Sequence, residues 1–186
     1  LDHPEFSPYT VNFEKVRKFK DNLIKLAYQH FKPEKQQDYS DFLTNSWWLD
    51  DYALFMSCKQ KYDFKGWVAW PKEIASRNPD SLKKYLKDNV EVVNYFRFEQ
   101  YLFFQQWKML KDYASRKQIF LFGDLPIYVA YDSVDVWANQ SIFTLTPETF
   151  QPTHVAGVPP DYFSDTGQRW GNPLYDWQNP NATTQM

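Results

Sequence analysis

The sequence predicts an α/β protein, with a helical region over residues 1–115 and a strand followed by long loops over residues 116–186. Two observations carry this prediction. Apolar residues in the first region recur at spacings of three and four, as on one face of a helix. The apolar run QIFLF (residues 118–122) comes after the last helix and before Gly-Asp, a pattern typical of a buried parallel strand.

Five helices are expected in the first region. The pattern over residues 11–31 predicts a helix that Pro33 ends. A second helix is expected to begin near residues 44–46, where Thr44 or Ser46 can cap it, and to continue through Met56. Short helices are expected over residues 71–76 and 81–87, and a long one over residues 90–114.

The helix over residues 90–114 has the clearest periodicity in the chain. Its apolar residues fall on one side at spacings of three, four and seven, which predicts that they face a core. The stripe consists of Val93, Phe96, Phe103, Trp107, Leu110 and Ala114.

Asp124 directly follows the predicted strand. The carboxyl ends of strands are where α/β proteins place groups that contact ligands, so Asp124 is a candidate binding residue. The alternative is an aspartate that caps the following turn. Asp132 and Asp135, slightly further on, are expected to cap a short helix.

Beyond Ile127 the pattern predicts only short segments and loops. A loop as long as residues 144–180 is expected in a compact domain only where it lines a functional site. Residues 157–173, GVPPDYFSDTGQRWGNP, hold three of the five glycines and three of the twelve prolines. Prolines stiffen one arm of this segment, and glycines permit sharp bends or close backbone approach.

Large aromatic and polar side chains are interleaved in the same segment. Tyr162, Phe163 and Trp170 offer flat apolar faces of the kind that pack on sugar rings. Amide, guanidinium and carboxylate groups beside them can hydrogen-bond to hydroxyls: Asp161, Asp165, Gln168, Arg169 and Asn172. This combination suits a polysaccharide chain, although the aromatic content of 20% also fits a large aromatic core.

The whole sequence disfavours several other classes. A net charge of -2 argues against nucleic-acid binding, which needs a basic face. No apolar run approaches transmembrane length, and LDHPEFSPYT lacks the features of a signal peptide. No phosphate loop and no His or Cys at metal-ligand spacing occurs. The single cysteine, Cys58, permits no internal disulfide, which indicates a reducing cytoplasm.

Four stretches carry a resemblance to a known family. GDLPIYVAYDSVDVWAN (residues 123–139) and VAGVPPDYFSDTGQRWGNPLYDW (residues 155–177) resemble the 4-alpha-glucanotransferases, also called amylomaltases or disproportionating enzymes. WLDDYALFMSCKQKY (residues 48–62) and FRFEQYLFFQQWKMLKDYA (residues 96–114) are similar to the same family. We expect the resemblance to cover residues 47–177 and to fail beyond Trp177.

The resemblance implies part of a (β/α)8 TIM barrel of the alpha-amylase clan with a helical insertion, as one incomplete catalytic domain. It implies a retaining transfer of an α-1,4-glucan segment to the 4-hydroxyl of glucose or of a maltooligosaccharide, without cofactor or metal. The expected partners are maltooligosaccharides and α-1,4-glucans, and the expected location is the cytoplasm.

The resemblance also implies roles for particular residues. Asp124 corresponds to an aspartate near the donor sugar, and the loop around residues 155–172 overhangs the family's active-site cleft. Trp170 would stack on sugar and Phe163 would help to exclude water. The predicted substrate-binding residues are Asp124, Asp161, Phe163, Gln168, Trp170 and Asn172.

No catalytic residue is predicted within the chain. The family's nucleophile and acid/base lie on later barrel strands, so the chain alone is expected to be inactive. Two alternatives stay open: a non-catalytic glucan-binding remnant, and a glycoside hydrolase of the same clan. A partial barrel is also expected to expose apolar surface and to associate with itself.

Overall fold

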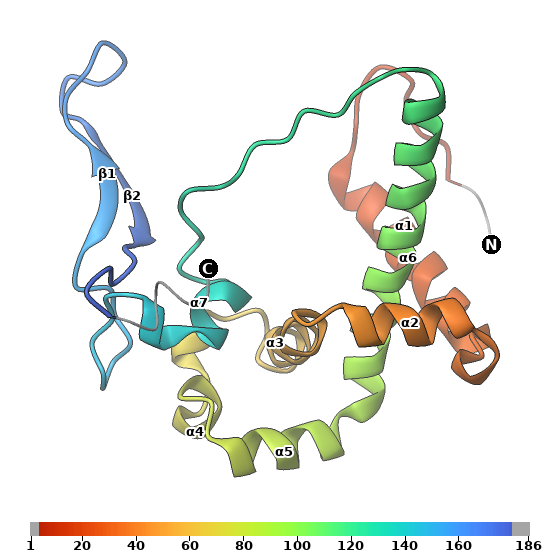
Figure 1. Cartoon of the computed structure of the whole chain (residues 1–186), viewed down its shortest axis with the longest axis horizontal. Coiled ribbons are helices and arrows are strands. Elements are labelled where there is room, and N and C mark those ends of the chain that lie inside the picture. The colour runs from red at the N-terminus through yellow and green to blue at the C-terminus, as the bar shows by residue number, and fades with distance from the viewer. Residues whose placement is uncertain (1–3, 180–186) are drawn as a thin grey trace.

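The computed structural model describes residues 4–179 and shows a mainly helical protein with one β-hairpin (Figure 1). The helices lie in the first three quarters of the chain, and the two strands follow them. The α-helices are α1 Phe13–His30, α2 Gln37–Asn45, α3 Leu49–Lys61, α4 Lys72–Ala75, α5 Pro79–Asp88, α6 Val90–Arg116 and α7 Val134–Ala138. Short 3-10 turns are η1 Pro33–Lys35, η2 Trp67–Ala69 and η3 Gln140–Ile142, and the strands are β1 Val155–Val158 and β2 Gln168–Pro173.

The predicted helices are largely confirmed, but the first residues of α1 and α3 differ from the prediction. α1 begins at Phe13, where Asn12 caps it by accepting a hydrogen bond from the backbone N–H of Lys15 at 2.9 Å. α3 begins at Leu49, without a side-chain cap, rather than near residues 44–46. Those residues close α2, a helix that the sequence pattern did not predict because its nine residues contain little apolar periodicity.

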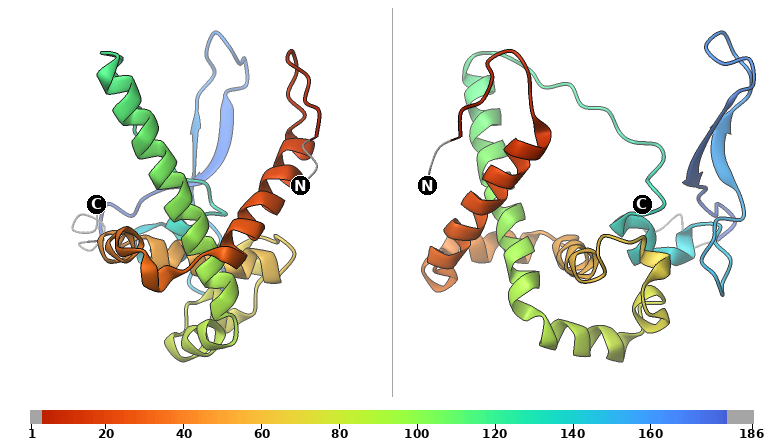
Figure 2. Two further views of the ribbon diagram at one scale, coloured as in Figure 1. Left: turned by 90° about the vertical axis from the view of Figure 1, so that its right-hand side faces the viewer. Right: turned by 180° about the vertical axis from the view of Figure 1, so that it is seen from behind.

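The main core lies where α3 crosses the amino-terminal half of α6 and meets η2, α4 and α7 (Figure 2). Two tryptophans are completely buried in it, Trp67 and Trp137. The indole N–H of Trp137 donates to the carbonyl of Ile74 at 3.0 Å, so the ring is both packed and hydrogen-bonded. This core joins segments that are more than 60 residues apart in the sequence.

A smaller aromatic cluster holds α1 and α2 against α6. Tyr39, Phe98 and Tyr101 are buried in it, and Phe31 packs on all three rings, with centroid distances of 4.9, 4.6 and 6.0 Å. The residue just after α1 therefore anchors that helix to α6.

The predicted core stripe of α6 is only half buried. Val93 and Phe96 lie in the core and Ala114 is buried, as expected. Phe103, Trp107 and Leu110 are 55%, 40% and 53% exposed, because the core cluster that buries Val93 and Phe96 does not reach these three residues. The prediction that the whole stripe faces a core is wrong for these three residues.

The predicted strand at residues 118–122 is wrong for this structure. Residues 117–127, which we call the linking segment, begin with a turn at Lys117 and Gln118 and then run without a partner strand from the end of α6 toward α7 (Figure 1). Phe120 and Phe122 are 89% and 102% exposed. A strand is assigned only where a neighbour exchanges backbone hydrogen bonds with it, and no described strand lies beside this segment.

The α/β prediction thus becomes, in the described residues, a helical assembly with one two-stranded antiparallel sheet. The sheet lies inside residues 144–180, which were predicted to be loop. Among the described residues, no helix is both long and apolar enough to cross a membrane.

Candidate functional site

The candidate site is a hairpin formed by residues 155–173, which projects away from the helical core (Figure 1). β1 and β2 pair antiparallel, with Val155 opposite Pro173 and Gly157 opposite Arg169, and a bulge between Val155 and Gly157. We call this unit the aromatic hairpin. It coincides with the segment that the sequence pattern singled out, but as strands and a turn rather than a loop.

Two glycines are required by the close approach of its backbones. A Cβ on Gly157 would lie 2.4 Å from the carbonyl oxygen of Gln168 on the opposite strand. Gly167 has a φ of +74°, and a Cβ there would lie 2.5 Å from the carbonyl oxygen of Val158. Any larger residue at either position would push the strands apart or strain the turn.

Asp161 organises the turn at the hairpin tip. Its Oδ1 accepts hydrogen bonds from the backbone N–H groups of Phe163 and Ser164, both at 2.9 Å. The Ser164 hydroxyl in turn donates to the carbonyl of Gly167 at 2.8 Å. The carboxylate predicted to bind sugar therefore has a structural role in this turn, which leaves Oδ2 as its remaining acceptor for a ligand.

Three large aromatic side chains of the hairpin are exposed. Tyr162 and Phe163, at the tip, are 97% and 87% exposed, with their rings edge to face at 5.7 Å. Trp170, on β2, is 48% exposed, and its indole N–H donates to Oε1 of Gln168 at 3.0 Å. Gln168 thus orients the Trp170 ring while its own amide N–H₂ remains available as a donor.

Asn172 joins the hairpin to a distant segment. Its side-chain amide donates to the carbonyl of Val129 at 2.8 Å. The contact of Asn172 with sugar stays a prediction, and its N–H₂ group already serves to hold β2.

Tyr128 is a neighbour that the sequence pattern did not single out. Its ring lies edge to face with Trp170, at 6.1 Å between centroids. It is 37% exposed, so the two rings extend one apolar surface. The signal available in the sequence was an aromatic residue four positions after Asp124 in the motif GDLPIY.

Asp124 is not brought to the hairpin. It is exposed and belongs to the linking segment, which is separate from the hairpin in Figure 1. In the described residues no cluster of His, Cys, Asp or Glu could hold a metal ion. The site therefore consists of two pairs of exposed rings, Tyr162 with Phe163 at the hairpin tip and Trp170 of β2 with Tyr128.

Comparison with known proteins identifies the family. The family model described as 4-alpha-glucanotransferase matches residues 2–184. The 4-alpha-glucanotransferase of Clostridium butyricum is 46% identical over 168 residues, which are 90% of this chain and 34% of that protein. That of Synechocystis sp. is 45% identical over 185 residues, 97% of this chain and 37% of that protein.

A solved structure agrees. The amylomaltase from Streptococcus agalactiae, in complex with acarbose, superimposes with a TM-score of 0.84 at 38% identity. The match covers 90% of this chain and 34% of that one.

Both the sequence and the fold therefore match a family of enzymes that transfer glucans. The chain belongs to the 4-alpha-glucanotransferase family. It spans about a third of the length of the relatives it matches. The match also runs beyond residues 47–177 at both ends, so the expectation that similarity fails after Trp177 is wrong.

Proposed function

We propose that the chain is part of a 4-alpha-glucanotransferase and that its aromatic hairpin binds the α-1,4-glucan. The observation that carries this proposal is the exposure of Tyr162, Phe163 and Trp170 on a hydrogen-bonded hairpin. Exposed aromatic rings cost free energy in water, and glucose rings present apolar C–H faces that can cover them.

The proposed reaction of the parent enzyme is a retaining transfer. One carboxylate attacks the donor sugar, a second acts as acid and then as base, and the 4-hydroxyl of an acceptor glucan takes the place of water. Both carboxylates would come from outside residues 1–186. The contribution of this chain is to hold the glucan and, through Phe163 at the hairpin tip, to keep water away.

The proposed parent fold is a (β/α)8 barrel in which the linking segment is a strand and α1 to α5 belong to a helical insertion. The exposed apolar residues of that segment and of α6 support this arrangement, because they have the composition of buried positions. The buried, unpaired thiol of Cys58 supports the cytoplasmic location expected from the sequence.

Titration of the purified chain with maltoheptaose tests the binding role. We expect Trp170→Ala to weaken binding by about tenfold, which corresponds to about 1.4 kcal/mol, because one stacking surface is lost. Trp47→Ala is the matched control, since Trp47 is 89% exposed and lies outside the hairpin. Equal affinity of the two variants would refute the assignment of the glucan to the hairpin.

Product analysis of the parent enzyme tests the reaction. Incubation with maltotriose should yield longer glucans if it is a transferase, and only shorter sugars if it is a hydrolase. The chain alone should leave maltotriose unchanged.

A further inference from the structure

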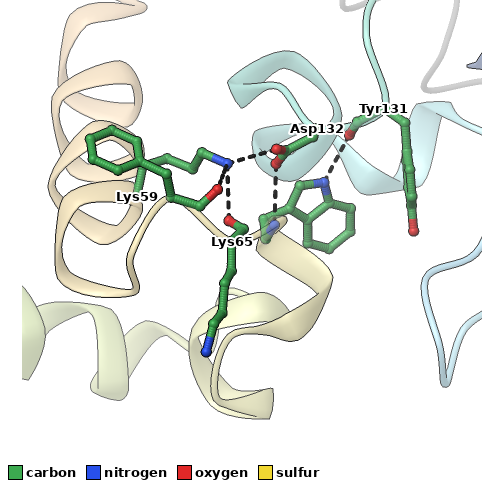
Figure 3. A network of polar contacts seen from close by, with 6 residues as sticks. Lys59, Lys65, Tyr131 and Asp132 are labelled. Atoms are coloured by element: carbon green, nitrogen blue, oxygen red, sulfur yellow. Dashed lines mark hydrogen bonds and ion pairs between the residues drawn. The ribbon is translucent and has the colours of Figure 1, made fainter.

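A largely buried lysine in the helical core lies at one end of a chain of contacts that ends at Trp170. The side chain of Lys59, on α3, is only 12% exposed, and its ammonium group donates three hydrogen bonds (Figure 3). The acceptors are the carbonyls of Phe64 and Lys65, at 3.0 and 2.9 Å, and Oδ2 of Asp132, at 2.6 Å. Every proton of the ammonium group therefore has a partner, and one of the three lies 73 residues away in the sequence.

Asp132 is held from a second side. Its Oδ1 accepts from the backbone N–H of Trp67 at 3.2 Å, while the indole N–H of Trp67 donates to the carbonyl of Tyr131 at 2.9 Å (Figure 3). The expectation that Asp132 caps α7 is wrong, since Ser133 caps that helix. The Asp132 carboxylate instead fixes its own segment to α3 and η2.

Tyr131 extends the same attachment toward the carboxyl-terminal region. Its ring packs on Trp67 at 5.8 Å, and its hydroxyl donates to the carbonyl of Phe150 at 2.8 Å. Burial, and secondarily the charge of Asp132, raise the pKa of Tyr131 to about 12, so the hydroxyl stays a donor at neutral pH.

The residues immediately before Tyr131 contact the hairpin. Tyr128 lies against the ring of Trp170, and the carbonyl of Val129 accepts from Asn172, two residues further along β2. Residues 128–132, which we call the bridging segment, thus contact β2 at one end and the Lys59 ammonium at the other. The base of the hairpin is held separately, through Thr144 with Leu174.

We propose that Lys59 and Asp132 are positioning residues that set the placement of the Trp170 face through the bridging segment. Neither touches the glucan in this arrangement. This proposal deepens the proposed function, and its test by glucan binding rests on that function. Its test by hydrogen exchange of the hairpin does not depend on any sugar.

The test compares two Asp→Asn variants by hydrogen exchange of the hairpin amides. In Asp132→Asn one of the two acceptor oxygens becomes an N–H₂ donor, so either Lys59 or the Trp67 N–H loses its partner. The control is Asp50→Asn, which breaks the ion pair of similar length, 2.8 Å, between Arg97 on α6 and the exposed carboxylate of Asp50 on α3. Lys59→Met serves as a second test variant, and Lys59→Arg retains the charge.

We expect Asp132→Asn and Lys59→Met to speed exchange of amides in residues 155–158 and 168–172 by at least about tenfold, with the amides of α6 unchanged. In Asp50→Asn the hairpin amides should exchange at the rate seen in the unsubstituted chain. In Lys59→Arg their exchange rate should lie between those of the unsubstituted chain and Lys59→Met. Equal hairpin exchange in Asp132→Asn and Asp50→Asn overturns the proposal, as does a rise of the same size in α6, which would report general destabilisation.

Titration with maltoheptaose provides the second readout. Asp132→Asn should bind about tenfold more weakly than the unsubstituted chain at a temperature where both are folded. Unchanged affinity overturns the positioning role in binding. If the unsubstituted chain itself binds no maltoheptaose, the proposed function of the hairpin fails, and hydrogen exchange alone decides whether Lys59 and Asp132 position it.

Discussion

The two halves of α6 carry the same kind of sequence and lie in opposite surroundings. In the first half, Val93, Phe96 and Phe98 are buried against α1, α3 and α5. In the second half, Phe103, Leu110 and Tyr113 are each more than half exposed, and the linking segment that follows is exposed as well. One helix thus passes from a packed core into solvent without a change in apolar content.

The difference shows that periodicity reports where an apolar face is, but not what covers it. The first half of the helix meets elements that lie within the described residues. The second half has an equally apolar face. Its exposed apolar side chains follow one another along the helix, whereas surface apolar residues are usually scattered singly. Such a face is expected to be covered in the state in which the protein functions.

A phenylalanine-to-alanine substitution made in each half of α6 tests the difference between the two halves most strongly. Phe96 is 7% exposed and Phe103, two turns further along the same helix, is 55% exposed. We expect Phe96→Ala to lower the free energy of unfolding by about 3–5 kcal/mol, because it leaves a cavity. Phe103→Ala should change it by about 0.5 kcal/mol, as is usual for surface sites.

Urea denaturation followed by tryptophan fluorescence measures both values. Equal destabilisation by the two variants would show that the second half of α6 is buried in solution. That outcome would point to self-association or a different placement of the linking segment.

The exposed half is expected to drive self-association of the isolated chain. Placing charge on this half and on the linking segment that follows it, as in the double variant Leu110→Lys and Phe120→Lys, should weaken association by at least about tenfold, because the apolar area available for contact falls. Sedimentation velocity over a range of protein concentrations measures the effect. The control is the double variant Trp47→Lys and Phe64→Lys, which adds the same charge at two exposed aromatic residues elsewhere and should leave association unchanged; an equal effect there would mean that net charge alone is responsible.

Glu99 lies between the buried and the exposed half of α6. Its substitution should change the stability of the chain less than the substitutions above. Burial, and secondarily the charge of Asp21, raise the pKa of its carboxyl above the ordinary 4.5. The charged form is therefore disfavoured in the folded chain, so its penalty is complete above the raised pKa and disappears as the pH falls below 4.5.

Glu99→Gln should accordingly raise the melting temperature slightly at pH about 7 and leave it unchanged at pH about 4. Thermal unfolding at the two pH values checks this, with Glu14→Gln on the exposed start of α1 as the control. A lower melting temperature at neutral pH would show that the Glu99 carboxylate is stabilised rather than penalised.

Much of the helical region could be predicted from the sequence. The spacing of apolar residues located α1 and α6, since a helix repeats its contacts every three or four positions, and the short helices α4 and α5 were also expected. The start of α3 was misplaced, because Thr44 and Ser46 have the chemistry of caps but lie at the end of α2 and in the connection after it. The candidate hairpin was located by its glycines and aromatic residues, although not as strands.

The roles of individual site residues could not be predicted in the same way. The contact of Asp161 with sugar stays a prediction, and the structure adds that its Oδ1 accepts two hydrogen bonds within the hairpin tip. The contact of Asn172 with sugar also stays a prediction, and the structure adds that its amide donates to the carbonyl of Val129, 43 residues away. Asp132 was expected to cap α7, and it instead pairs with Lys59.

The sequence by itself determined the local features of this protein: where helices form, where Gly157 permits close approach of two strands and Gly167 a tight turn, and which aromatic residues the hairpin carries. These depend on short-range geometry, which neighbouring residues dictate. Only the tertiary structure decided which half of α6 is buried, whether residues 118–122 pair as a strand, and which polar groups are already in use. Those outcomes depend on partners that lie tens of residues away, because burial and long-range hydrogen bonds exist only once the chain has brought them together.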